Sequence, residues 1–314
     1  MLIDNGIQPE TPETVSLGDF LERWLRTVVR PDLAESTYVN YELALRLHII
    51  PAIGGITLAA ITPAHIRSML ASVEGQGAKR LCFTAIKSAF TVAKGDGLLL
   101  TSPCDAVATP KSEREEIDPF TLVETELILN ELRDHRLGAL VRLAMSFGFR
   151  QSELFGLRWQ NVDMKKGTLG VVRQGVTIKG RTHISAPKTK AGKRDIQLTD
   201  ACVEALQQRR AISLKEGFAG HELVFPNRRG KVILRDNFSR YPWGPTLKAL
   251  KLDHRGFHQC RHTAATRMLT DRVPVHIVSA ILGHANATVT LNTYAKDLPD
   301  QQQVATESVA RLLG

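Results

Sequence analysis

A polar, charged stretch about a third of the way along the chain limits how the rest of it can fold. Asp105 to Pro119 contains five acidic and two basic side chains, and prolines stand at positions 103, 110 and 119. Proline removes a backbone donor and charged side chains bury little apolar surface, so this composition favours an extended linker. We therefore predict a linker over 108–119 between two domains, which suits a chain of 314 residues.

The residues before the linker predict a small, all-helical domain over 15–107, after a polar segment at 1–14 that we expect to be flexible. Apolar residues recur with helical spacing through this region. Pro31 is expected to end the first helix, Ser36 to cap the second, and a turn over 51–55 to end the second. The predicted helices cover residues 17–28, 36–48, 62–70 and 78–94.

The residues after the linker predict a second domain over 120–296, which combines helices with a small antiparallel sheet. Thr121 and Glu124 have the spacing of a capping box, which begins a helix. Between 167 and 198, alternating β-branched residues punctuated by glycines are typical of a three-stranded sheet. Helices are predicted up to 149, from about 152, and over 200–214, 235–250, 258–270, 274–281 and 286–295. The expected fold class is therefore mainly α with a small antiparallel β-sheet.

The net positive charge of the chain comes from this second domain. Residues 1–119 have 11 Lys and Arg against 15 Asp and Glu, whereas residues 120–296 have 29 against 14 and the last eighteen have 1 against 3. A basic surplus on one domain is typical of a face that binds a polyanion such as DNA. The alternative is a solvated basic surface that only aids solubility.

The sequence contains no apolar stretch long enough to cross a membrane and no N-terminal signal pattern. We therefore expect no membrane partner and a cytoplasmic location. The four cysteines show no paired spacing, which suits a reducing compartment.

Two segments near the C-terminus contain side chains suited to phosphodiester cleavage. Residues 258–262 are His-Gln-Cys-Arg-His, and Tyr294 follows His284 by ten residues. A tyrosine hydroxyl has an unperturbed pKa of about 10, so attack at neutral pH needs a proton acceptor and positive charge for the transition state. Histidines and arginines supply both.

A zinc site is the alternative for His258 and His262, because histidines four residues apart on a helix can share a metal and Cys260 lies between them. The segment lacks the glutamate of zinc proteases, and Arg261 would repel a divalent cation. We predict no metal here.

Four motifs occur in order over about 145 residues, and together they resemble the tyrosine recombinase family, also called phage integrases. They are Phe-Gly-Phe-Arg-Gln-Ser-Glu-Leu with Gly-Leu-Arg-Trp at 147–159, Pro-Lys-Thr-Lys at 187–190, the His258/Arg261 pair, and Leu-Gly-His to Tyr at 282–294. Residues 36–38, 51–54 and 61–63 resemble that family's core-binding domain. The resemblance implies a helical, SAM-like core-DNA-binding domain followed by an α+β catalytic domain.

The resemblance also implies roles for particular side chains. Two arginines of the family hold the non-bridging phosphate oxygens, a lysine on a β-hairpin turn protonates the leaving 5′ oxygen, one histidine is a general acid/base and another hydrogen-bonds the phosphate. The tyrosine forms a 3′-phosphotyrosyl bond that conserves the energy of the broken ester. Glu153 is expected to support the first arginine, and Lys190 is the alternative lysine. The implied catalytic residues are Arg150, Lys188, His258, Arg261, His284 and Tyr294.

Double-stranded DNA with an attachment or core site is the partner that the resemblance implies. Members of the family act as homotetramers on a DNA synapse, with the tail at 297–314 expected to dock on a neighbouring protomer and an accessory bending or directionality factor as a further possible partner. The reaction is an isoenergetic transesterification, so no cofactor is expected. On the helix over 78–94, one polar face suits the major groove, although an ordinary solvated face is the alternative. That face consists of Arg80, Thr84, Lys87 and Thr91.

Integration and excision of a mobile element is the favoured function, because the ten-residue spacing from His284 to Tyr294 and the Pro-Lys-Thr-Lys turn resemble those of integrases from phages and conjugative elements. Xer-like resolution of chromosome or plasmid dimers is an alternative within the family. A type IB topoisomerase shares the chemistry, and a catalytically silent DNA-binding regulator is the alternative outside enzymes.

Overall fold

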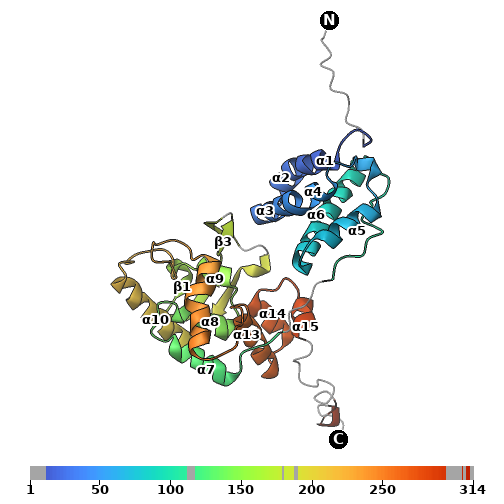
Figure 1. The fold of residues 1–314 in the computed structure, drawn as a ribbon. Coiled ribbons are helices and arrows are strands. Elements are labelled where there is room, and N and C mark those ends of the chain that lie inside the picture. Colours follow the sequence, from blue (N-terminus) through green and yellow to red (C-terminus); the bar gives the residue numbers. More distant parts are fainter. Residues whose placement is uncertain are drawn as a thin grey trace. The chain divides into compact units, whose positions relative to one another are not determined.

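The computed structural model describes residues 12–111, 117–178, 180–186 and 190–294, together with 306 and 309–311. It divides into two compact units, Met1–Glu115 and Glu116–Gly314, which Figure 1 shows with their elements labelled. Each unit has its own buried apolar core. The mainly helical fold class with small antiparallel sheets is confirmed.

The described part of the first unit consists only of helical segments packed around one core. Trp24 stacks on Tyr41 at the centre, with ring centroids 5.7 Å apart. Its segments are α1 (Leu17–Trp24), η1 (Leu25–Val29), α2 (Arg30–Asp32), α3 (Glu35–Ala44), η2 (Leu45–Ile49), α4 (Ile50–Ile53), η3 (Leu58–Ala60), α5 (Pro63–Ser72) and α6 (Gln76–Gly95).

The helical runs end at Asp32 and Ile53, one residue beyond Pro31 and within the expected turn over 51–55, but both prolines lie inside the runs rather than after them. Each proline follows a π-helical turn, and the Ile50 N–H donates to the Leu45 carbonyl, one residue farther back than in an α-helix. A wider turn displaces the carbonyl that a proline ring would otherwise meet, so the run continues through Pro51 to Ile53. The second helix also begins earlier than expected, with Ala34 rather than Ser36 at its N-cap.

The second unit begins with the predicted capping box, in which Thr121 and Glu124 satisfy each other's backbone N–H groups. Its helical segments surround two small sheets. They are α7 (Leu122–Glu131), α8 (Gly138–Phe147), α9 (Gln151–Phe155), η4 (Trp159–Asn161), η5 (Lys190–Gly192), α10 (Asp200–Lys215), α11 (Arg235–Phe238), η6 (Ser239–Trp243), α12 (Gly244–Ala249), α13 (Gln259–Thr270), α14 (Val275–Leu282) and α15 (Ala287–Tyr294).

The strands form two sheets rather than the single three-stranded sheet expected over 167–198. One sheet has the antiparallel order β1-β2-β5, and β3 pairs with β4 in a separate hairpin. The hairpin lies against α9, where a Cβ on Gly156 would come within 2.6 Å of the Gln174 backbone, so only glycine allows this approach. The strands are β1 (Val162–Asp163), β2 (Thr168–Val171), β3 (Gln174–Ile178), β4 (Arg181–Ser185) and β5 (Arg194–Gln197).

Several expectations fall on residues outside the described parts of the chain. They include the flexible segment 1–14 apart from its last three residues, residues 112–116 of the linker, and the tail at 297–314 apart from 306 and 309–311. Among the described helices, none is long and apolar enough to cross a membrane.

Candidate active site

Arg150 lies where α8 ends and α9 begins. Gly148 caps α8 in the left-handed conformation, with φ of 65°, and turns the chain so that Arg150 becomes the N-cap of α9. A Cβ at Gly148 would come within 2.6 Å of Leu282 in α14. The tight turn therefore brings the α8–α9 junction against the helix that precedes His284.

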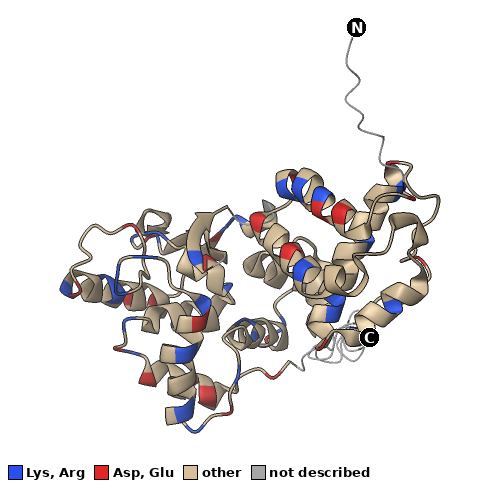
Figure 2. Ribbon diagram, turned by 45° about the horizontal axis from the view of Figure 1, so that its top comes forward, with Lys and Arg blue, Asp and Glu red and all other residues tan. Residues whose placement is uncertain are grey.

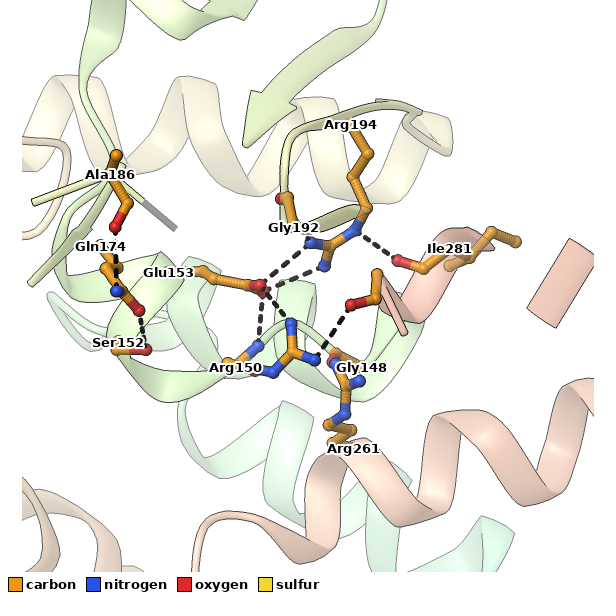
Figure 3. Close-up of polar contacts among 11 residues, drawn as sticks. Gly148, Arg150, Ser152, Glu153, Gln174, Ala186, Gly192, Arg194, Arg261 and Ile281 are labelled. Atoms are coloured by element: carbon orange, nitrogen blue, oxygen red, sulfur yellow. Dashed lines mark hydrogen bonds and ion pairs between the residues drawn. The ribbon is translucent and has the colours of Figure 1, made fainter. Parts of the chain in front are cut away.

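Glu153 anchors Arg150 from one turn along α9. Its side chain is 4% exposed and accepts from the Arg150 N–H at 2.8 Å and from Arg150 Nη1 at 2.9 Å. Both of its oxygens also accept from Arg194, each at 3.0 Å, as Figure 3 shows. Burial alone would raise the pKa of Glu153, but hydrogen bonds and charge from Arg194 and Arg150 outweigh it and lower that pKa. Glu153 is therefore an ionised anchor between two arginines, in agreement with its expected supporting role.

Arg194, at the start of β5, is a residue that sequence reasoning missed. Besides the pair with Glu153, its Nε donates to the Ile281 carbonyl at 2.6 Å and its Nη1 to the Gly192 carbonyl at 3.2 Å (Figure 3). It thereby connects α9, the end of η5 and the end of α14. Nothing local in the sequence distinguishes Arg194 from the other basic residues of this tract.

Arg261, on α13, is a buried cation with capacity for one more hydrogen bond. It is 3% exposed, and its Nη1 donates to the Gly148 carbonyl at 2.7 Å. Its Nη2 has no hydrogen-bond partner among the described residues. Burial and the charge of Arg150 lower the pKa of Arg261 to about 9. A buried cation whose local carboxylate is already bound by two other arginines favours an incoming anion.

Arg150 points toward the same place. Its side chain is 37% exposed, and its Nη2 donates to the Gly283 carbonyl at 3.1 Å. Two guanidinium groups, one buried and one partly open to solvent, thus lie at the junction of α9, α13 and α14. This arrangement suits two oxygens of one phosphate.

His258 and His284 lie close enough to these cations for the positive charge to lower their pKa values. The pKa of His258 is lowered to about 4 by loss of hydration and by the charges of His262 and Arg261. Loss of hydration and the charges of Arg261 and Arg150 lower the pKa of His284 to about 4. Both rings are therefore neutral at pH 7 and can exchange a proton or a hydrogen bond with a ligand.

Tyr294, at the end of α15, is 1% exposed, and its ring is buried among Leu269, Val278 and Leu282. Its hydroxyl lies 2.8 Å from Nδ1 of His262. Sequence reasoning had weighed His262 only as a zinc ligand, and the spacing of residues 258–262 was the available signal. Among the described residues, no group of three or more potential ligands could hold a metal ion.

Lys188 lies outside the described residues, but the described residues on both sides of it are anchored to α9. Before it, Gln174 Nε2 donates to the Ala186 carbonyl at 3.0 Å, and Ser152 Oγ donates to Gln174 Oε1 at 3.5 Å (Figure 3). After it, Arg194 donates hydrogen bonds to the Gly192 carbonyl and to Glu153. The roles of Lys188 and Lys190 stay predictions.

The polar face of α6 is exposed as expected, at Arg80, Thr84, Lys87 and Thr91. The Thr84 and Thr91 hydroxyls donate to the carbonyls of Arg80 and Lys87, at 2.7 and 2.9 Å. Their oxygens keep free lone pairs for a further donor. Figure 2 colours the Lys and Arg positions blue on the ribbon, and these positions recur along helices and loops of the second unit. DNA binding by either surface stays a prediction.

Comparison with known proteins gives consistent matches. The phage integrase family matches residues 120–301, and the N-terminal SAM-like domain of phage integrases matches residues 16–72. A tyrosine recombinase XerC-like protein of Caldanaerobacter subterraneus subsp. tengcongensis is 30% identical over 336 aligned positions, which cover 98% of this chain and 85% of that protein. An integrase of Saccharopolyspora erythraea is 22% identical, with 91% and 80% covered.

Solved structures share the fold. The Tn1549 transposon integrase in complex with a circular intermediate DNA superposes with a TM-score of 0.78 at 19% identity, covering 94% of this chain and 99% of that one. A lambda integrase tetramer bound to a Holliday junction gives a TM-score of 0.67 at 20% identity, covering 91% and 84%.

Proposed function

Since this chain belongs to the phage integrase family of tyrosine recombinases, we propose that Tyr294 cleaves and rejoins DNA at a core site through a 3′-phosphotyrosyl bond. The protein is a site-specific recombinase. The proposal concerns which residues act and on what DNA.

The buried guanidinium of Arg261 is the observation on which this proposal rests. Its Nη2 lacks a hydrogen-bond partner among the described residues, and its guanidinium interacts electrostatically with Arg150 and Tyr294. A scissile phosphate bound between Arg150 and Arg261 would satisfy that donor and place phosphorus near the phenol. As the pentavalent state forms, charge grows on the non-bridging oxygens, which the two arginines stabilise. His284 holds Thr290 through Nδ1 at 2.7 Å, which leaves Nε2 for the phosphate.

Strand cleavage then forms the Tyr294 Oη–phosphorus bond and breaks the bond from phosphorus to the 5′ oxygen. The phenol loses its proton and the 5′ oxygen gains one, for which Lys188 is the proposed donor. Religation reverses each transfer, and no electron transfer is involved. Because Tyr294 is 1% exposed, its hydroxyl must be uncovered before it attacks DNA.

We infer integration and excision of a mobile element as the biological reaction, with a homotetramer assembling on two DNA sites. The names of the relatives support both this function and Xer-type recombination, since they include prophage integrases and XerC proteins. The lambda integrase tetramer on a Holliday junction supports tetrameric assembly. An accessory directionality factor remains part of the proposal.

A two-site plasmid assay tests the proposal. The element that encodes this chain supplies the core sequence, which is found as the repeat at its two ends. With two directly repeated sites, the wild-type protein should release a circle with one site, and Tyr294→Phe should release none. Relaxation of supercoils without any exchange, equally on plasmids lacking the sites, would indicate a type IB topoisomerase instead.

A further inference from the structure

We propose that His262, not His258, is the base that takes the proton from Tyr294 during strand cleavage and returns it during religation. This inference rests on the proposed function of Tyr294. It assigns a catalytic role to a histidine that directly contacts a reacting atom.

The geometry distinguishes His258, the N-cap of α13, from His262 within that helix. They lie four residues apart, on one face of the helix, and their rings meet edge to face with centroids 4.8 Å apart. Nδ1 of His262 lies 2.8 Å from the Tyr294 hydroxyl, within the range for direct proton transfer. The Tyr294 and His262 ring centroids are 5.6 Å apart. The described structure gives His258 no hydrogen bond to that hydroxyl.

The position of the phenol is fixed from the other side by α15. Thr290 and Tyr294 lie four residues apart and both are buried, so they share the inner face of the helix. His284 binds the Thr290 hydroxyl at 2.7 Å, which ties the loop before α15 to that face. Tyr294 belongs to a buried apolar cluster that includes Leu269 of α13. The hydroxyl is therefore directed to α13 at the level of His262.

The proton balance follows from this contact. With its own hydrogen on Nε2, a neutral His262 accepts the phenol proton at Nδ1 while the Oη–phosphorus bond forms. The resulting imidazolium lies near the phosphate, whose charge stabilises it in place of the lost phenol contact. When the 5′ hydroxyl attacks the phosphotyrosine, the imidazolium returns the proton to the departing phenolate.

Single-turnover cleavage of a nicked suicide duplex, followed by gel separation of the covalent adduct, tests the assignment. His262→Asn, which keeps a hydrogen-bonding side chain without a base, should slow cleavage by about 10²- to 10⁴-fold. Difluorotyrosine in place of Tyr294, whose phenol is more acidic, should recover much of that loss in His262→Asn because less help is needed to remove the proton. A substrate with sulfur at the 5′-bridging position should not recover it, because sulfur relieves only the leaving group.

His258→Asn is the matched control, since it alters the same face of α13 one turn earlier. If His262 is the base, difluorotyrosine should recover little of any loss in His258→Asn. Recovery in His258→Asn and none in His262→Asn would overturn the proposal and make His258 the base. A His262→Asn protein that cleaves at the wild-type rate, or faster, would also overturn it, and would show that the contact only restrains the tyrosine at rest.

Failure of this inference can be told apart from failure of the proposed function. If the wild-type protein forms no covalent adduct, the function of Tyr294 itself is wrong. If the wild type forms the adduct and His262→Asn cleaves at the wild-type rate or faster, only the role of His262 is rejected. Equal binding of the duplex by the wild type and by both asparagine variants excludes loss of folding as the cause.

Discussion

Removing the charge of Glu153 should destabilise the second unit by more than the loss of a single hydrogen bond would. Glu153→Gln keeps the shape of the side chain but leaves Arg194, 8% exposed, and Arg150 without their shared carboxylate. Removing one partner of a buried ion pair costs about 3–5 kcal/mol, because the remaining charge stays buried and uncompensated. The free energy of unfolding should fall by about that amount at pH 7.

The effect should depend on pH with a defined sign. The pKa of Glu153 is lower in the folded protein than in the unfolded chain. Its contribution is therefore complete above the ordinary glutamate pKa, near ~4.3, and is lost as the pH falls through the lower, folded value. The difference between the wild type and Glu153→Gln should shrink only in that acidic range.

Urea unfolding measures this difference, with tryptophan fluorescence as the signal. In a Trp24→Phe background, the two remaining tryptophans, Trp159 and Trp243, both belong to the second unit. Glu131→Gln, an exposed change on α7, is the control and should cost under about 0.5 kcal/mol. A loss of under 1 kcal/mol for Glu153→Gln, or a loss that is unchanged at low pH, would refute the reasoning.

Three further predictions concern the site and the DNA. Gly283→Ala should abolish cleavage, because φ there is +67° and a Cβ would come within 2.6 Å of Arg194 Nη1. The control Gly217→Ala, with φ of +79° and open space around it, should retain cleavage. Equal adduct yields from the two variants would contradict this prediction. Lys188→Ala should cleave an ordinary phosphodiester slowly but a 5′-bridging sulfur substrate at nearly the wild-type rate, and rescue of Lys190→Ala alone would move the acid to Lys190. Lys87→Ala should weaken DNA binding and lower the slope of log affinity against log salt by about 1, and an unchanged slope in a binding titration would remove Lys87 from the DNA interface.

Local signals in the sequence predicted the starts of several elements. Thr62 and Thr121 cap helices as expected, since a capping hydroxyl acts only on the next turn of its own helix. The positions of Pro31 and Pro51 inside the helical runs could not be predicted in this way. A π-helical turn depends on packing across the first unit, and no residue beside the proline predicts it.

The residues of the candidate site also fall into two groups, those that local motifs predicted and those that only the folded structure identifies. Arg150, Arg261, His258, His284 and Tyr294 could be named because each belongs to a short motif, and the structure brings all five into one region. Arg194 and His262 could not be assigned their contacts, because Arg194 meets Glu153 across 41 residues and His262 meets Tyr294 across 32. Contacts at that separation are set by how helices and strands pack, which no local pattern encodes.

Mass spectrometry of the covalent adduct tests the central claim most directly. The wild-type protein is trapped on a nicked suicide duplex in the presence of EDTA, and the DNA and the protein are then both digested to completion. We predict that the peptide containing Tyr294 carries the added mass of a nucleotide, joined through its 3′ phosphate. A nucleotide on any other residue, linkage through a 5′ phosphate, or an adduct that forms only without EDTA would contradict the account.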